Sequence, residues 1–305
     1  MSTSRGTIGI VIPTHNRYDK LRALLRSVRR YGTAQIKRVV VVDDSDEPND
    51  LVPEFKDLNL TQIIASERIF ISKAKNFGWR NTDTEYVYFI DDDNIIGEQT
   101  IRPVFEVIST SDSTGAIMPA VMYKSRPEFV WVYATPFLNS RLVLNLVGRN
   151  QVRNASLENR LLKTDALPNA SLVRRKALED VGGFDERLVV NSSMDFAMRL
   201  KAKSWRVFSY TGALIYHDVE PPGHLGWWAT HGSVDPDRVR YELRDWFMIM
   251  RIWHTKKRLF RLSTTAESFR FVLPNLLAYL ARSKSRRRLV RSLMTGYLEG
   301  LRIIN

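Results

Sequence analysis

Short apolar runs alternate with amphipathic segments through the first third of the chain. The runs at residues 7–12, 38–42 and 86–90 are rich in β-branched or aromatic residues, which is typical of strands that are buried on both faces. Ile63 and Ile64 indicate a further short strand. Each of the three longer runs ends at proline or at acidic residues, so each has a clear end.

Helical patterns lie between these runs. Residues 73–81 are expected to form one helix, and residues 19–31 another, which ends before Gly32. The i, i+3, i+4, i+7 pattern of the second helix is carried by Leu21, Leu24, Leu25 and Val28. Buried strands separated by helices predict an α/β fold, with a mostly parallel central sheet and helices on both faces.

Aspartates follow two of the predicted strands directly. Asp43 and Asp44 come after the run at 38–42, and Asp91–Asp93 come after the run at 86–90. The carboxyl ends of parallel strands meet at one edge of a sheet, so both clusters should lie beside the loop 13–17. Adjacent carboxylates repel one another unless a cation neutralises them. A site for Mg²⁺ or Mn²⁺ with room for a diphosphate is therefore expected here, and a simple polar turn is the alternative.

The order of these motifs resembles the inverting GT-A glycosyltransferases of family 2, over roughly residues 7–250. The resemblance is carried by the segments IGIVIPTHNRYDKLRALLRSV, VVVVDDSDE, SKAKNFGWRNTDTEYVYFIDDDN, SLVRRKALEDVGGFDERL and MDFAMRL. It implies a Rossmann-like GT-A fold and the transfer of a hexose with inversion. It also implies a donor linked to UDP, GDP or dTDP, and Mg²⁺ or Mn²⁺ as cofactor.

The resemblance also assigns residues on the donor side. Pro13, Thr14 and Asn16 would line the nucleotide pocket, Asp44 would accept a hydrogen bond from the base, and Asp92 would lie with them in the nucleotide-sugar site.

Further donor-side residues are expected around the diphosphate. Lys75, where the family usually has arginine, would face the diphosphate, and Asn76 would hold the geometry of a loop. Asp91 and Asp93 would form the metal-binding Asp-x-Asp motif, with Asp93 the direct ligand, and His217 would lie near the metal. The alternative for His217 is a purely structural role.

The acceptor side is expected around the turn Gly183, Phe184 and Asp185 and the segment that follows it. Ser192–Ser193 stands where the family usually has a Glu-Asp pair that supplies the general base, and serine is not a base at neutral pH. Asp195 is the expected base. It also lies one helical turn before Arg199 and could pair with it. Asp185 or Glu186 as the base, or a catalytically weak chain, are the alternatives.

The excess of basic charge is concentrated at the C-terminal end. The net charge is +13, and nearly all of it comes from residues 251–305, where clustered Lys and Arg alternate with apolar residues. We therefore expect a catalytic domain over residues 1–250 and a basic amphipathic helical tail over 251–305. The tail would bind an anionic membrane surface, pack on the domain or form a homodimer.

Composition narrows the function further. The chain has no cysteine, and no apolar stretch is long enough to cross a bilayer. A cytoplasmic protein that is peripheral at the inner face of the membrane and acts on a lipid-linked or other saccharide is the expectation. The alternatives are a sugar-phosphate nucleotidyltransferase and a nucleotide-sugar-binding homologue with weak catalysis. A nucleic-acid partner is not expected, because no recognisable RNA- or DNA-binding module accompanies the basic tail.

Overall fold

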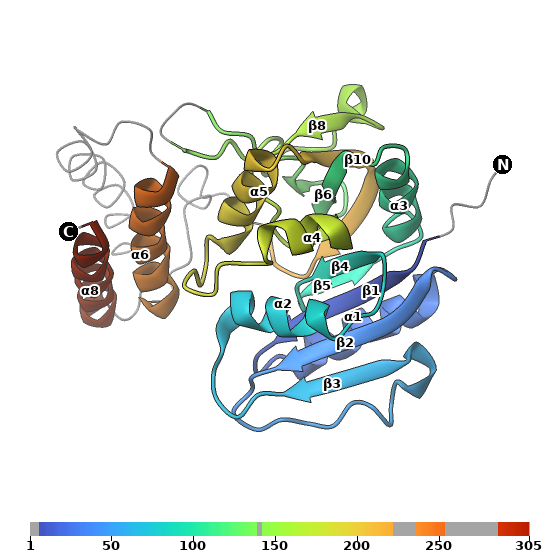
Figure 1. Ribbon diagram of the computed structural model, residues 1–305, viewed down its shortest axis with the longest axis horizontal. Coiled ribbons are helices and arrows are strands. Elements are labelled where there is room, and N and C mark those ends of the chain that lie inside the picture. The colour runs from blue at the N-terminus through green and yellow to red at the C-terminus, as the bar shows by residue number, and fades with distance from the viewer. Residues whose placement is uncertain (1–5, 139–141, 222–235, 254–285, 305) are drawn as a thin grey trace. The chain divides into compact units, whose positions relative to one another are not determined.

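The computed structural model describes residues 6–138, 142–221, 236–253 and 286–304 (Figure 1). One mixed sheet forms the centre of the first and larger part of the chain. In spatial order its strands are β3 (Leu60–Ile64), β2 (Ile36–Asp43), β1 (Ile8–Thr14), β4 (Tyr86–Ile90), β9 (Ala170–Arg174), β6 (Thr114–Tyr123), β10 (Arg206–His217) and β5 (Asn94–Ile96). Two short strands join its margins: β7 (Val130–Val132) pairs with β6, and β8 (Leu161–Lys163) pairs with β10.

The sheet is parallel on one side and mixed on the other. Strand β1 pairs in parallel with β2 and β4, and β2 pairs in parallel with β3. Strand β9 then runs antiparallel to both β4 and β6, while β6 and β10 are again parallel. The expected parallel arrangement therefore holds for the first four strands. Strand β9 runs the opposite way, and β6 and β10 return to the direction of β4.

Helices accompany the strands as the sequence pattern predicts. Strand β4 has the predicted bounds, and helix α1 begins one residue earlier than predicted. The helices are α1 (Tyr18–Tyr31), α2 (Phe70–Arg80), α3 (Ile101–Ser109), α4 (Arg175–Val181), α5 (Ser192–Ala202), α6 (Pro236–Trp253) and α8 (Arg286–Ile304), with 3₁₀ turns at Lys56–Leu58 and Ala155–Leu157.

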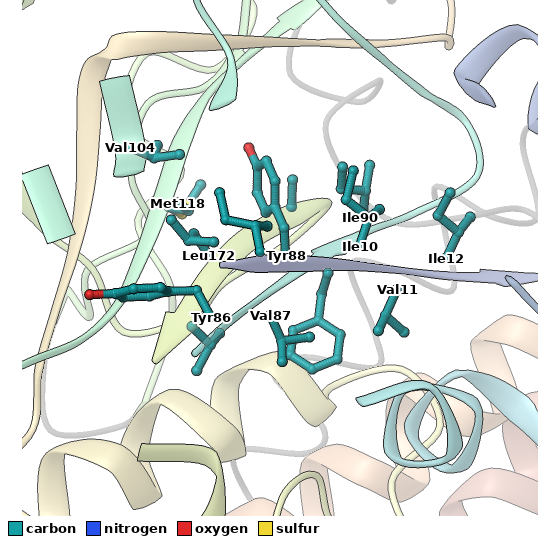
Figure 2. Close-up of a cluster of buried hydrophobic side chains, with 14 of the residues drawn as sticks. Ile10, Val11, Ile12, Tyr86, Val87, Tyr88, Ile90, Val104, Met118 and Leu172 are labelled. Carbon is teal, nitrogen blue, oxygen red and sulfur yellow. The ribbon is translucent and has the colours of Figure 1, made fainter. Parts of the chain in front are cut away.

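Both faces of the central strands are apolar. Figure 2 shows Ile10, Ile12 and Ile90 on one face, and Val11 and Val87 on the other. All five side chains are buried. Because apolar residues cover both faces, the strands are fixed in the interior and their polar ends emerge at the sheet's edge. This edge carries the candidate site.

Helices α6 and α8 pack against each other in a second compact unit, to which residues 187–192 also belong. Their contact buries Val239, Leu243 and Phe247 of α6 against Leu289 and Leu293 of α8. The expected domain boundary at residue 250 falls inside α6.

The rest of the predicted tail is described only in part. Residues 254–285, which supply most of its expected apolar face, lie outside the described residues. None of the helices that the structure describes is long and apolar enough to cross a membrane.

Candidate active site

The loop after β1 lies against the aspartates that follow β2 and β4. Thr14, the last residue of β1, donates its hydroxyl hydrogen bond to Asp92 at 2.7 Å. Its carbonyl accepts from the backbone N–H of Asp44 at 3.2 Å. Asn16 adopts a positive φ of 55° and its N–H donates to Ser45 Oγ at 2.8 Å. Both predicted aspartate clusters are thus joined to the end of β1, where Pro13 also lies.

Asp44 connects the end of β2 to the start of α2. Its Oδ2 accepts hydrogen bonds from the backbone N–H groups of Ile69 and Phe70, at 2.9 and 3.0 Å. His15 Nδ1 lies 3.1 Å from its Oδ1. The carboxylate is buried and held in one orientation. Phe70 has a positive φ of 60°, which is costly for an aromatic residue.

The three consecutive aspartates after β4 contact different basic residues. Lys75 Nζ lies 3.1 Å from Asp91 Oδ1. Arg17 lies between the other two, with Nη2 2.5 Å from Asp92 Oδ1 and Nη1 2.8 Å from Asp93 Oδ2. The repulsion expected among adjacent carboxylates is therefore reduced by two cations that come from distant parts of the chain.

Burial and charge give the last two aspartates opposite properties. Burial raises the pKa of Asp92 to about 7, although the charge of Arg17 opposes this shift. Burial alone would also raise the pKa of Asp93, but the hydrogen bond and charge of His217, together with Arg17, lower it to about 2. Asp93 is consequently the carboxylate that stays an anion at neutral pH.

Asp93 and His217 provide two suitable ligands for a divalent cation. His217, the last residue of β10, has its Nε2 3.4 Å from Asp93 Oδ2. Carboxylate oxygen and imidazole nitrogen suit Mn²⁺ and, for the oxygen, Mg²⁺. No group of three or more acidic or histidine side chains forms such a site within the described ranges. These residues fit a cation that takes its remaining ligands from a diphosphate and water.

Asn76 fastens helix α2 to the predicted acceptor-side turn. Its Oδ1 accepts from the backbone N–H of Phe184 at 2.9 Å, and its Nδ2 donates to the Phe184 carbonyl and to Glu186, both at 2.9 Å. Lys75 Nζ, next to it in sequence, lies 5.7 Å from the centre of the Phe184 ring. Lys75, which contacts Asp91, and Asn76, which binds the segment 182–186, are therefore neighbouring residues of helix α2.

The paired glycines give this turn its shape. Gly182 and Gly183 have φ of 74° and 81°, a region that other residues rarely adopt. A Cβ on Gly183 would overlap Asn76 Oδ1, whereas a Cβ on Gly182 would meet nothing within 4 Å. Phe184 stacks on Phe196 with ring centres 4.3 Å apart. Asp185 follows this buried ring and is half-exposed.

Asp195 is buried in the first turn of α5. Its Oδ2 accepts from Arg199 Nε at 2.7 Å. Arg199 Nη1 also donates to the carbonyls of Val181 and Gly183, at 2.8 and 2.7 Å. The alternative considered for Asp195, a pairing with Arg199, is therefore present, and it connects α5 to the glycine turn.

A family profile matches the segment that contains most of these elements. Residues 9–182, more than half of the chain, match glycosyl transferase family 2. The chain belongs to this family. Two relatives support it: a chondroitin synthase of Escherichia coli, 25% identical over 245 residues, and a pre-mycofactocin glycosyltransferase of Mycobacterium tuberculosis, 25% identical over 229 residues. These alignments cover 71% and 70% of this chain but only 35% and 43% of the relatives, so the chain spans less than half of their length.

Solved structures share the fold of this family 2 chain. GalNAc-T7 with UDP, GalNAc and Mn²⁺ has a TM-score of 0.62 at 11% identity, covering 97% of this chain and 54% of that one. The mannosyltransferase PcManGT of Pyrobaculum calidifontis, with GDP-Man and Mn²⁺, has a TM-score of 0.55 at 17% identity, covering 98% and 88%. The predicted GT-A fold is confirmed.

One residue at the centre of this cluster in the family 2 chain was not predicted from the sequence. Arg17 contacts both Asp92 and Asp93, although the sequence pattern marks it only as part of a loop. A basic residue beside the polar segment that follows β1 is the signal that could have drawn attention to it.

Proposed function

We propose that this chain is a metal-dependent glycosyltransferase that moves a sugar from a nucleotide-diphosphate donor to an acceptor with inversion. The observation that carries the proposal is the meeting of Asp93, His217 and Arg17 at the carboxyl ends of β1, β4 and β10. Structural neighbours crystallised with UDP and Mn²⁺, with GDP-Man and Mn²⁺, and with UDP-GlcNAc support a donor of this class.

Asp93 and His217 would hold the metal, with Asp91 as the other member of the Asp-x-Asp motif. A bound Mg²⁺ or Mn²⁺ stabilises negative charge on the departing diphosphate. Sugar transfer develops positive charge on the sugar and negative charge on the leaving group. Arg17, which is half-exposed, and Lys75 are cations fixed beside the aspartates where that negative charge would form.

The nucleoside would lie against the loop after β1. Pro13, Thr14 and Asn16 are the proposed lining, with Asp92 behind them. Asp44 is the proposed acceptor for a hydrogen bond from the base. Its orientation is already fixed by two backbone N–H groups, so a bound base would meet a carboxylate that needs no further ordering.

Asp195 is the proposed general base, on the acceptor side with Gly183, Phe184 and Asp185. A base must accept the proton of the attacking hydroxyl, and a carboxylate in fixed orientation suits this role. A donor-binding protein without turnover is the second candidate, and the observation that favours it is Ser192–Ser193 in place of two carboxylates.

The proposed acceptor is a saccharide linked to a polyprenyl phosphate, reached from the inner face of the membrane. Helix α8 supports this location, since it exposes basic residues together with Val290, Met294 and Leu298. Exposed apolar and basic side chains on one helix are typical of binding at a lipid headgroup layer. The exposed arginines of α8 are Arg286, Arg287, Arg288, Arg291 and Arg302.

A donor screen tests the enzymatic proposal. Purified protein is incubated with UDP-, GDP- and dTDP-sugars, and nucleoside diphosphate release is measured with Mn²⁺ and with EDTA. We expect release from one nucleotide class, with metal only. Binding of a donor without release would favour the second candidate, and release that is insensitive to EDTA would contradict metal dependence.

Vesicle binding tests the membrane proposal. Replacement of Val290, Met294 and Leu298 by serine changes only exposed side chains and leaves the buried Leu289 and Leu293 in place. We expect the wild type to sediment with vesicles containing phosphatidylglycerol and the triple variant to stay in the supernatant. Equal sedimentation of both would contradict the proposal, and a shift from dimer to monomer in the variant would assign this face to a second copy.

A further inference from the structure

A tight turn at residues 148–150 carries a cation close to the candidate metal ligands. Arg149 stacks on the indole of Trp131, with its Cζ 4.2 Å from the ring centroid. Trp131 in turn meets the ring of His217 edge-on, with centroids 5.1 Å apart. Tyr123 and His217 are paired residues at the carboxyl ends of the parallel strands β6 and β10. Because the Tyr123 hydroxyl donates to Asn150, the turn is fastened to the same sheet edge as the candidate metal ligands.

The backbone of this turn takes the left-handed conformation on both sides of Arg149. Gly148 and Asn150, on either side of Arg149, have φ of 75° and 60°. A Cβ on Gly148 would lie 2.5 Å from the ring of Tyr133, so only glycine fits there. The Asn150 N–H donates to the Val130 carbonyl at 2.8 Å. Such backbone conformations persist when their surroundings enforce them, and they gather at functional sites.

The hydrogen-bonding capacity of Arg149 is largely unused. Nη1 donates to the Trp131 carbonyl at 3.3 Å, and the buried Nε has no acceptor among the described residues. Among the described residues, no carboxylate contributes to the electrostatic surroundings of its guanidinium. Burial lowers the pKa of Arg149, and only the weaker influence of Tyr123 opposes this. Arg149 is half-buried, and a guanidinium that is largely removed from water without a counter-ion is unfavourable, so an anion that reached it would supply a missing partner.

Other half-buried arginines of the described chain show the contrast. Arg199 has the carboxylate of Asp195, and Arg174 has three backbone carbonyls as acceptors. Arg175 likewise donates to the carbonyls of Thr84 and Thr82. Arg199 Nη2 also lacks an acceptor, but Arg149 differs from the other three in having one backbone carbonyl and no carboxylate among its described acceptors.

We propose that Arg149 binds an oxyanion of the acceptor, a phosphate or a carboxylate, beside the transfer site. The inference rests on the proposed function, because it gives that function a chemical class of acceptor. Arg17 and Lys75 are the cations next to the aspartates, while the rings of Trp131 and His217 lie between Arg149 and Asp93. The geometry therefore assigns Arg149 to a group other than the donor's diphosphate. Arginine suits phosphate and carboxylate alike, because its planar fork binds both through paired hydrogen bonds.

Calorimetric titration of anions tests the proposal. UDP and Mn²⁺ are kept saturating so that donor phosphate positions are filled, and glucose 1-phosphate, glucuronate and methyl glucoside are the probes. We expect one of the two anions to bind the wild type at least about tenfold more tightly than Arg149→Gln, as charge-assisted hydrogen bonds require. Neutral methyl glucoside should show no such dependence. The anion that responds identifies phosphate or carboxylate as the source.

A matched control is Arg126→Gln. Arg126 also stacks on an aromatic ring, Phe129 at 4.1 Å, but it is exposed and already paired with Glu128. We expect this control to bind both anions like the wild type. Arg149→Lys, which keeps the charge, should retain part of the affinity and remains informative where the glutamine variant fails to fold.

Two results would overturn the proposal. One is equal anion binding by Arg149→Gln and the wild type. The other is anion binding that disappears in both proteins once UDP fills the donor site. Absence of nucleotide release from every donor tested with the wild type would count against the proposed function, while the anion titration still decides the role of Arg149.

Discussion

Two aspartate–arginine pairs of this chain differ in where their partners come from. Asp93 meets Arg17 from the loop after β1 and His217 from the end of β10, so three distant segments converge on it. Asp195 meets Arg199 one turn along the same helix. A pair at i, i+4 forms whenever a helix presents the two residues on one face. Convergence from distant segments requires the whole sheet, and it therefore indicates a site more strongly than a pair within one helix.

The two pairs also differ in their remaining contacts. Arg199 donates to two backbone carbonyls and so fastens α5 to the glycine turn, which is structural support. The Arg17 side chain contacts Asp92 and Asp93 and stays half-exposed. Its position would allow it to contact a ligand without breaking the fold. Variants at the two pairs should therefore have different effects.

The largest effect is expected at Asp93. Asp93→Asn removes the ionised carboxylate next to His217 and should lower turnover by about a thousandfold, the loss typical of removing a key electrostatic group. Asp83→Asn is the control, since Asp83 is exposed just before the other end of β4. Steady-state rates of nucleotide release measure both. Turnover near wild type in Asp93→Asn would remove the basis for calling this cluster the active site.

Variants of Asp195 and Arg199 distinguish a general base from a purely structural ion pair. As general base, Asp195→Asn should slow transfer by about a hundredfold or more, with Arg199→Gln much less affected. Both variants lose the ion pair, and Arg199→Gln also loses the hydrogen bonds to Val181 and Gly183, so its thermal midpoint should fall at least as far as that of Asp195→Asn. Equal losses of rate in the two variants would show that Asp195 has only a structural role, and would leave Asp185 and Glu186 as the candidate bases.

A smaller effect is expected at Asp44. Asp44→Ala should raise the KM for the donor by about tenfold with little change in kcat, because it removes uniform binding of the base. The variant also frees the N–H groups of Ile69 and Phe70, so its thermal midpoint is measured alongside. A fall in kcat with unchanged KM would contradict the assignment.

The smallest effect should distinguish the two glycines of the acceptor-side turn. Gly182→Ala introduces only the cost of a positive φ, about 1 kcal/mol of unfolding free energy. Gly183→Ala adds the overlap with Asn76 and should cost roughly 3 kcal/mol. Urea unfolding of both measures the difference. Equal losses would mean that the contact between Asn76 and this turn contributes little.

Local patterns made part of the fold and site predictable. The run at 86–90 is apolar on both faces and stops at Asp91, so strand β4 and the position of its aspartates follow from the sequence. The pair of glycines at 182–183 likewise indicates a turn with positive φ, and both residues have it in the structure.

Contacts between distant segments could not be predicted in this way. Arg17 and Asp93 are 76 residues apart, and their pairing depends on how β1 and β4 align in the sheet. The reversal at β9 and the stacking of Arg149 on Trp131 depend in the same way on packing that no local pattern encodes.

Anomalous diffraction from crystals soaked with Mn²⁺ and UDP, GDP or dTDP tests the central claim most directly. The account predicts a manganese peak within about 2.2 Å of both Asp93 Oδ2 and His217 Nε2, the usual range for oxygen and nitrogen ligands. It also predicts diphosphate oxygens on the same ion. A nucleotide bound with no manganese at these two side chains, or a manganese peak elsewhere, would contradict it.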